Sequence, residues 1–437
     1  MSAAELSVVF FIQLFLIVAA ARLIGWLGKR FLGQPQVVGE MIAGVVLGPS
    51  LFGLFFPDLS ALIFPAESKS ILYVGAQLGV GLYMFLVGLG FDRSHFRANV
   101  TSAGAVSLSG MAVPFVIAII LAPWLMEEGL FSPQMTRAEA TLFFGACIAI
   151  TAFPMLARII HERGLSNSPL GTLSLSAGAI DDACAWGVLA IVLATFGAGA
   201  GVAVKAIVSA LAFAVVMIGF GPRLFARLGR TAEEKGGIDH GLLGIVLMLF
   251  LLSAFAMDWA GMHAVFGGFL LGTAMPRGVL TRDIRAKLEP FTVVLLLPMF
   301  FTYSGLNTKL DVMTDPSLFL VAAVILAASV LAKFGACWAA ARLTGQDNPT
   351  ALGIGALMNS RGLMELIIIN IGLQQGLIGV ELFSILVMMA VATTLMASPL
   401  FELVYGRKAR ARGELGALAE VSDGPEGQPL QPRMTHR

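Results

Sequence analysis

The sequence predicts an all-α membrane protein with about thirteen transmembrane helices, a fold class supported by its composition, its apolar runs and its basic loops. Hydrophobic residues make up 57% of the 437 residues and charged residues only 13%, whereas a soluble globular protein carries about 25% charged residues. With a net charge of only +1, this composition excludes a soluble enzyme, a disordered chain and a nucleic-acid binder. Most of the surface is expected to face lipid.

Thirteen apolar runs, each bounded by charged residues, Gly or Pro, approach the length of about 20 residues that a membrane-spanning helix needs. The first follows Glu5 rather than a basic segment, which predicts a retained helix and not a cleaved signal. Residues 1–405 form the expected membrane domain, and the polar segment 406–437 a short, disordered cytoplasmic tail. The predicted spans are 6–27, 36–54, 70–90, 99–122, 139–161, 169–196, 201–224, 239–256, 260–275, 288–306, 316–341, 350–371 and 378–405.

The loops between these spans carry their basic residues on one side of the membrane. One alternate set of loops holds fifteen Lys and Arg residues, and the other holds only Lys69, Arg137 and Lys309. Because basic loops stay in the cytoplasm, this asymmetry predicts a cell-membrane protein with its N-terminus outside and its C-terminus inside. An odd number of spans agrees with that orientation.

An odd number of spans also permits two six-helix repeats of opposite orientation, a plan found in secondary transporters. The repeats would cover about 6–197 and 239–405, with a linker helix at about 201–224. In such proteins, matching helices are interrupted near the bilayer midplane. A proline kink or a packing patch of small residues would explain one such interruption. Polar or helix-breaking clusters occur in the fifth helix of each repeat, however, and this favours two broken helices. The clusters run from Thr151 to Pro154, and through Asn359, Ser360, Arg361 and Gly362.

Three charges deep inside predicted spans are candidates for ion and proton binding, because each costs about 2.5–3.5 kcal/mol at the bilayer centre. Asp181 and Asp182 are adjacent in the sixth span, so their side chains diverge by about 100° and address different neighbours. One can be held by a permanent charge while the other faces a water-filled cavity. Lys333, deep in the eleventh span, would lose its proton if unpaired, and one of the aspartates is its expected counter-ion. The alternative is that Lys333 snorkels to an interface.

Three further charges are candidates for structural or gating roles. Arg361 and Glu365 are four residues apart, which on a continuous helix would make them an ion pair. Just past a helix break, they could instead neutralise exposed helix ends or reach separate acids. Glu40, at the beginning of the second span, is expected near an interface.

Three segments resemble one known family. Gln36–Ser50 closely resembles the early helix of monovalent cation:proton antiporters of the Kef/Nap type, the monovalent cation:proton antiporter-2 family. Thr151–Arg158 and Met358–Leu366 resemble corresponding segments of that superfamily, which includes the plant cation/proton exchangers. The resemblance covers residues 6 to 405 and keeps the order of the motifs.

The resemblance implies a thirteen-helix dimer in which a core domain moves against a dimerisation domain, with the broken fifth and twelfth helices crossing. It implies that Asp182 is the essential ion- and proton-binding carboxylate, that Asp181 pairs with Lys333 at rest, and that Thr151 helps to line the site. Two departures from the Kef members stand out. No long nucleotide-binding domain follows, and the Asn359–Gly362 cluster differs from the family's Gln-Gly-Gly-Glu. We therefore do not expect glutathione-gated potassium efflux.

These residues predict a secondary active antiporter that exchanges Na+ or K+ for protons by alternating access at Asp181 and Asp182. Its expected partners are monovalent cations, protons, membrane lipid and a second copy of the chain, with no cofactor, no enzymatic activity and no nucleic acid. The alternatives are a proton-coupled exporter of an organic solute on the same scaffold and, less favoured, a cation channel. An intramembrane aspartyl protease is disfavoured because it needs two aspartates from different helices.

Overall fold

The computed structural model describes residues 2–406, apart from 33, 35, 50, 91–99, 163–164, 166–167, 197–199, 261–263 and 309–314. The predicted tail lies outside the described residues except for Gly406. The described residues are almost entirely helical, and eight of their helical segments are long and apolar enough to cross a membrane. The fold is therefore that of an all-α, multi-pass membrane protein.

Long helices form where an apolar run is uninterrupted, and their bounds follow the predicted spans closely. The agreement is best for the sixth span, which the sequence places at 169–196 and which forms one helix over those residues. These helices are α1 (Ala3–Leu32), α5 (Lys69–Gly90), α7 (Val100–Glu127), α10 (Pro169–Phe196), α14 (His240–Trp259), α18 (Pro316–Leu343) and α21 (Val380–Phe401).

Other predicted spans form shorter or divided helices. The two with polar clusters each break into two half-helices, and the tenth passes through a π-helical turn. These are α2 (Gln36–Leu47), α8 (Arg137–Ala149), α9 (Phe153–Glu162), α11 (Ala200–Val215), η2 (Val216–Phe220), α12 (Gly221–Leu224), α15 (Ala264–Ala274), η3 (Thr292–Leu296), α17 (Leu297–Leu306), α19 (Asn348–Met358) and α20 (Leu363–Gln374).

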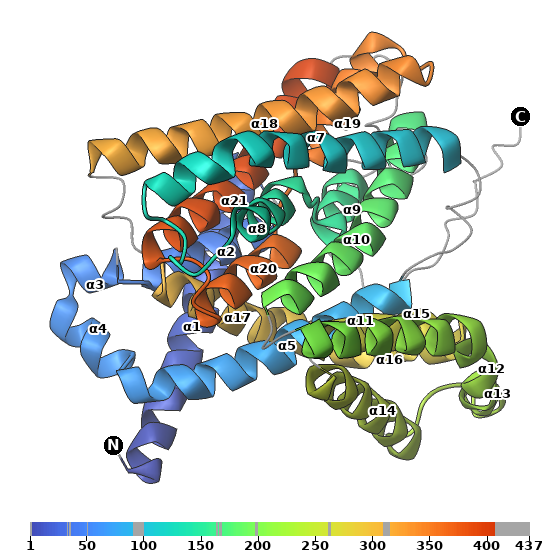
Figure 1. The fold of residues 1–437 in the computed structure, drawn as a ribbon. Helices are drawn as coiled ribbons and strands as arrows, with labels where there is room; N and C mark the ends of the chain where they lie inside the picture. The colour runs from blue at the N-terminus through green and yellow to red at the C-terminus, as the bar shows by residue number, and fades with distance from the viewer. Residues whose placement is uncertain are drawn as a thin grey trace, which may run out of the picture.

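The helices form two bundles, which we call the core bundle and the scaffold bundle. In the core bundle, α7 and α18 lie side by side and enclose the half-helices together with α10 and α21 (Figure 1). In the scaffold bundle, α2 packs on α1 and α17, and α5 packs on α15 and α17. The packing recurs between the halves of the chain: α7 packs on α8 as α18 packs on α19, and α9 packs on α10 as α20 packs on α21. This recurrence agrees with two structural repeats.

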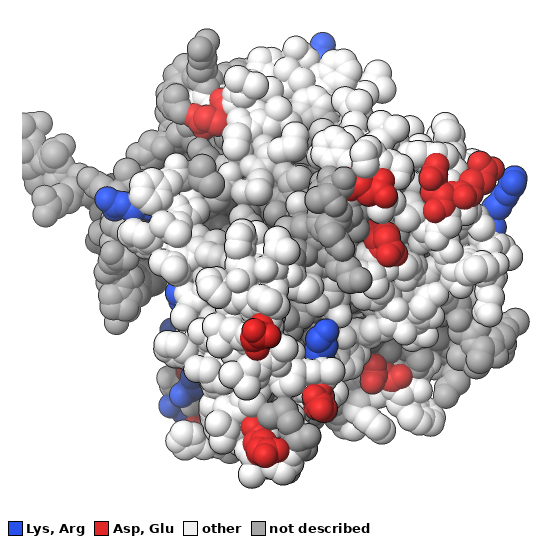
Figure 2. All heavy atoms as spheres, turned by 90° about the vertical axis from the view of Figure 1, so that its left-hand side faces the viewer, with Lys and Arg blue, Asp and Glu red and all other residues white. Residues whose placement is uncertain are grey.

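Connections that the sequence assigns to one side of the membrane meet in the structure. The helices α13 (Ala226–Glu234) and α16 (Val279–Phe291), in two basic connections, pack together, and the Ile238 amide donates to Asp283 at 3.1 Å. At the ends of other helices, Phe131 pairs with Ile378 in an isolated β-bridge. The face in Figure 2 is covered mostly by uncharged residues, as lipid contact requires.

The scaffold bundle is closely packed where α2 crosses α17, because two glycines meet there. A Cβ atom on Gly305 would lie 1.9 Å from the Gly44 carbonyl oxygen, and one on Gly44 would lie 2.2 Å from the Phe301 carbonyl oxygen. Backbone atoms cannot move aside as a flexible side chain can, so any side chain at these positions would separate the helices.

We therefore expect Gly305→Ala to destabilise the protein by about 1–3 kcal/mol, the usual cost of overpacking. The matched control is Gly104→Ala, because a Cβ atom on Gly104 of α7 meets nothing within 4 Å. Thermal unfolding of the purified protein in detergent should show a lower midpoint for Gly305→Ala and an equal or higher one for the control. Equal midpoints for both variants would contradict the close crossing.

Candidate functional site

The two broken helices cross inside the core bundle through their unwound segments. Between α8 and α9, the Ala152 amide donates to the carbonyl of Ser360, which lies between α19 and α20, at 3.1 Å. The Thr151 hydroxyl donates at 2.9 Å to the carbonyl of Met358, the last residue of α19. The interruptions expected from the sequence are therefore present, and hydrogen bonds join one to the other.

Two cations meet the C-terminal end of α8. The last carbonyls of a helix have no partner within it, and they carry the negative end of the helix dipole. The Arg361 guanidinium donates to the carbonyls of Cys147 at 2.8 Å and Ile148 at 2.7 Å. The Lys333 ammonium donates to the next carbonyl, that of Ala149. Three successive carbonyls of a helix that ends inside the protein are thus satisfied by two positive charges.

The same ammonium forms a buried ion pair with Asp181. Lys333 Nζ lies 2.6 Å from Asp181 Oδ2, and the side chains are 1% and 0% exposed. The other carboxylate oxygen of Asp181 accepts a hydrogen bond of 2.7 Å from the Ser107 hydroxyl on α7. Buried ion pairs need such extra hydrogen bonds, because taking two charges out of water costs several kcal/mol per ion. The sequence reasoning did not identify Ser107, although a serine three residues before Gly110 in an apolar run was a usable signal.

A glycine on α7 makes room for this ion pair. A Cβ atom on Gly110 would lie 2.6 Å from Cys337 Sγ and 3.4 Å from Lys333 Nζ. The absence of a side chain therefore lets α18 approach α7, so that Lys333 lies beside the helix that carries Ser107.

Asp182 and Pro154 are described only by their backbone. Asp182 follows Asp181 on α10, and Pro154 is the second residue of α9. Both side chains lie outside the described part of the structure.

The remaining residues of the second cluster are buried and fix the crossing. Asn359 donates from its amide to the Val330 carbonyl at 3.4 Å. Gly362 is required for space rather than for its backbone angle, because a Cβ atom there would lie 2.8 Å from Met155 Cγ. Ser360 is also buried.

The backbone of Arg361 is held by α21, through a residue that the sequence reasoning missed. The Arg361 amide donates to the Thr394 hydroxyl at 3.2 Å. Thr394 is one of several hydroxyl residues of α21, beside Thr393 and near Ser398, so the sequence did not single it out for this contact.

Glu365 and Glu40 are both buried but belong to different bundles. Glu365 is in the first turn of α20, and its Oε1 lies 3.4 Å from Arg361 Nη1. Glu40 is on α2 in the scaffold bundle and is 1% exposed. The helix α2 also packs on α21 of the core bundle.

Two half-helix pairs crossing around a buried ion pair, within an all-helical membrane fold, are features of secondary transporters. Residues 17–404 match the profile of the family described as "Sodium/hydrogen exchanger, transmembrane". The chain belongs to this family.

Relatives and a solved structure agree with the assignment. The Na+/H+ antiporter NhaS4 of Synechocystis sp. is 38% identical over 401 residues, covering 90% of this chain and 96% of that protein. Cation/H+ antiporter 18 of Arabidopsis thaliana is 31% identical over 412 residues, and the match covers 92% of this chain but only 50% of the plant protein. The structure of the sodium proton antiporter MjNhaP1 from Methanocaldococcus jannaschii has the same fold, with a TM-score of 0.64, 15% identity and coverage of 95% and 100%.

The ion pair can be tested by a double-mutant cycle. Lys333→Gln would leave the buried Asp181 carboxylate without its cation, so we expect a loss of about 3–5 kcal/mol in stability. Asp181→Asn in the same chain removes the orphaned charge and should restore most of that loss. Unfolding midpoints of the wild type, both single variants and the double variant provide the measurement.

The control for this cycle is the exposed pair of Lys235 and Asp239, whose side chains are 53% and 49% exposed. Lys235→Gln should leave the midpoint unchanged, because exposed pairs contribute little. Simple additivity of the two single losses at Asp181 and Lys333 would show that they do not interact.

Proposed function

We propose that this chain is a secondary active antiporter that exchanges Na+ or K+ for protons, with Asp182 as the cation- and proton-binding carboxylate. The single observation that supports the site most strongly is the Asp181–Lys333 ion pair beside the crossed helix breaks. NhaS4, a relative matched along almost its whole length, is named a Na+/H+ antiporter. The cation and the proton bind by ordinary carboxylate chemistry, without a cofactor.

Exchange follows from competition at one carboxylate. Asp182 can hold a proton or a monovalent cation, but positive charges crowded at one group disfavour both at once. Thr151 and the unwound backbone near it supply oxygen ligands for a cation, as interrupted helices do in other secondary transporters. Each passage of Asp182 across the barrier therefore carries one species or the other, which couples the two flows without a second binding site.

The Asp181–Lys333 pair supplies a second proton carrier. When a cation enters, it competes with Lys333 for the aspartates, and the ion pair opens. An ammonium left unpaired in a dry environment releases its proton, because burial disfavours the charged form. Two protons would then move against one cation, and each net charge is worth about 2.3 kcal/mol per 100 mV of membrane potential.

Alternating access would occur by movement of the core bundle against the scaffold bundle. Two hydrogen bonds link α20 to the scaffold bundle. Asn370 donates to Ser304 Oγ on α17 at 3.2 Å, and the Tyr73 hydroxyl on α5 donates to Gln374 Oε1 at 3.2 Å. Neutral hydrogen bonds contribute about 0.5–1.5 kcal/mol each. They can therefore break and re-form during a transport cycle.

Orientation and assembly complete the proposal. The C-terminus lies in the cytoplasm, because the predicted spans place it on the same side as the connections that carry most of the basic residues. Two of these connections contain α13 and α16, which pack together. The protein acts in the cell membrane as a homodimer, with scaffold bundles facing each other. This arrangement leaves both core bundles free to move.

Asp182→Asn should abolish cation-driven proton movement. The carboxamide cannot take up or release a proton and carries no negative charge for a cation, so both halves of the exchange fail. The measurement is the fluorescence of a pH dye in proteoliposomes after addition of Na+ or K+, with Glu381→Gln, at an exposed position on α21, as a matched control. Full activity in Asp182→Asn would refute the assignment.

Lys333→Ala should make the exchange electroneutral if the protein retains transport. Without the ammonium, only the Asp182 proton can be exchanged for one cation, so no net charge moves. The measurement is cation-driven proton flux at different potassium-diffusion potentials. A flux that still depends on membrane potential would show that Lys333 is not the second proton carrier.

A further inference from the structure

One buried acid of the core bundle has no part in the proposed exchange. Glu365 is 1% exposed and lies in the first turn of α20. Its Oε1 is 3.4 Å from Arg361 Nη1, and its Oε2 has no hydrogen-bond partner among the described residues. An acid with one poorly paired oxygen and one unpaired oxygen, both out of water, requires an explanation.

Arg361 makes only a long contact with Glu365, because its short contacts go to other groups. Its guanidinium donates to the Cys147 and Ile148 carbonyls at 2.8 and 2.7 Å. A charge-assisted contact between a guanidinium and a carboxylate is normally 2.7–2.9 Å long, and the contact with Glu365 is 3.4 Å. The short contacts thus go to the end of α8, and the long one goes to the acid.

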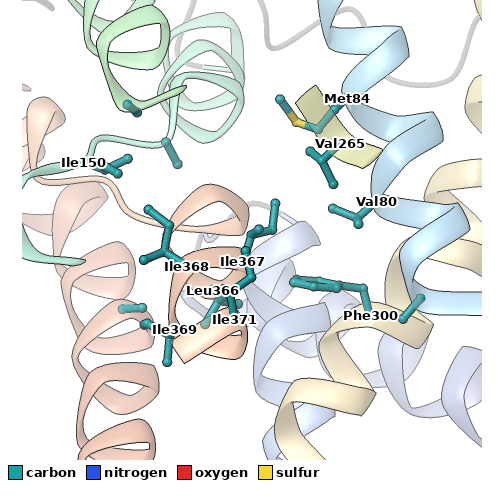
Figure 3. Packing of buried hydrophobic residues seen from close by; sticks show 14 of the residues in the cluster. Val80, Met84, Ile150, Val265, Phe300, Leu366, Ile367, Ile368, Ile369 and Ile371 are labelled. Atoms are coloured by element: carbon teal, nitrogen blue, oxygen red, sulfur yellow. The ribbon is translucent and has the colours of Figure 1, made fainter. Parts of the chain in front are cut away.

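The surroundings of Glu365 disfavour a carboxylate ion. The residues that follow it on α20, from Leu366 to Ile369, are apolar and buried, and Figure 3 shows them between the α8–α9 break and the scaffold helices. In such a low-dielectric environment the charged form of an acid is penalised unless it is fully paired. The neutral, protonated form is the one that tolerates a weak contact with Arg361.

Apart from Arg361, the charged and titratable groups described around Glu365 supply no close counter-ion for a carboxylate. Cys147 faces it from α8, and Lys333 from α18 acts on it at longer range. Lys333 is itself paired with Asp181 at 2.6 Å. The helix α21 packs along α20, but between Glu381 at its beginning and Glu402 after its end it contains only uncharged residues.

We propose that Glu365 is an additional proton-binding site, separate from Asp182 and from the Asp181–Lys333 pair, and that it controls how Arg361 holds the end of α8. While Glu365 holds its proton, Arg361 remains on the Cys147 and Ile148 carbonyls. When the proton leaves to water, the carboxylate attracts the guanidinium and weakens those two contacts. Because Lys333 binds the next carbonyl of the same helix end, the change reaches the ion pair.

The site makes a direct spectroscopic prediction. Infrared difference spectra of the purified full-length protein, titrated with acid and base, should contain a band of a neutral carboxyl group that shifts in deuterium oxide. Glu365→Gln should lose this band, and the exposed matched control Glu381→Gln should keep it. Glu365→Asp, which retains an acid, should keep a displaced band. Identical carboxyl regions in the wild type and Glu365→Gln would overturn the proposal.

A second readout rests on the proposed exchange function. The carboxamide of Glu365→Gln imitates the protonated acid at every pH, so its rate of cation-driven proton exchange should match the wild type at low pH and diverge as pH rises. Glu365→Asp should restore a pH-dependent step. Parallel profiles across the whole range would contradict the proposal.

The two proposals can fail separately. If the wild-type protein moves no protons in response to Na+ or K+, the exchange function fails, whereas the infrared band still decides whether Glu365 binds a proton. If exchange is normal and no band depends on Glu365, only the proton-binding site at Glu365 is refuted. Equal unfolding midpoints for the wild type and Glu365→Gln would ensure that a lost band reflects a lost proton and not a lost fold.

Discussion

The constraint on which the core bundle depends is the C-terminal end of α8, buried inside the protein. A helix that stops in a dry environment leaves carbonyl groups that neither water nor its own backbone can satisfy. Arg361 and Lys333 meet three of them in succession, and they come from the second half of the chain. The first broken helix is therefore stable only when the second half is folded around it, which makes the crossing an obligatory feature of the fold.

The two cations suit different tasks. A guanidinium is always charged and presents several donors in a plane, so Arg361 can hold two carbonyls at once. The Lys333 ammonium is a compact point charge on a flexible stem. It binds one carbonyl and Asp181 together, so the proposed opening of the ion pair would leave Arg361 on the other two carbonyls. This division allows a charge to move without unfolding the site.

Much of this arrangement could be predicted from the sequence. The ends of helices formed by uninterrupted apolar runs, such as α10, could be predicted, because burial in lipid depends on local composition. The helix breaks and the pairing of Lys333 with an aspartate also followed from local pattern and from the cost of a buried charge. The partners of Arg361 did not: its contacts with Cys147 and Ile148 join residues more than 200 positions apart. Such contacts depend on how the halves cross, which no local pattern records.

A buried ion pair is weak evidence for stability, because apolar residues of equal volume often serve as well or better. The Asp181–Lys333 pair is, in our proposal, a functional element, and surrounding hydrogen bonds such as that from Ser107 offset the cost of burying it. The helix α20 then links that element to movement. Its N-terminal end follows Arg361, and its C-terminal end contacts the scaffold through Asn370 and Gln374. A charge change at the crossing therefore acts on the same rigid helix whose other end holds the two bundles together, and this gives proton and cation binding a physical route to the movement between them.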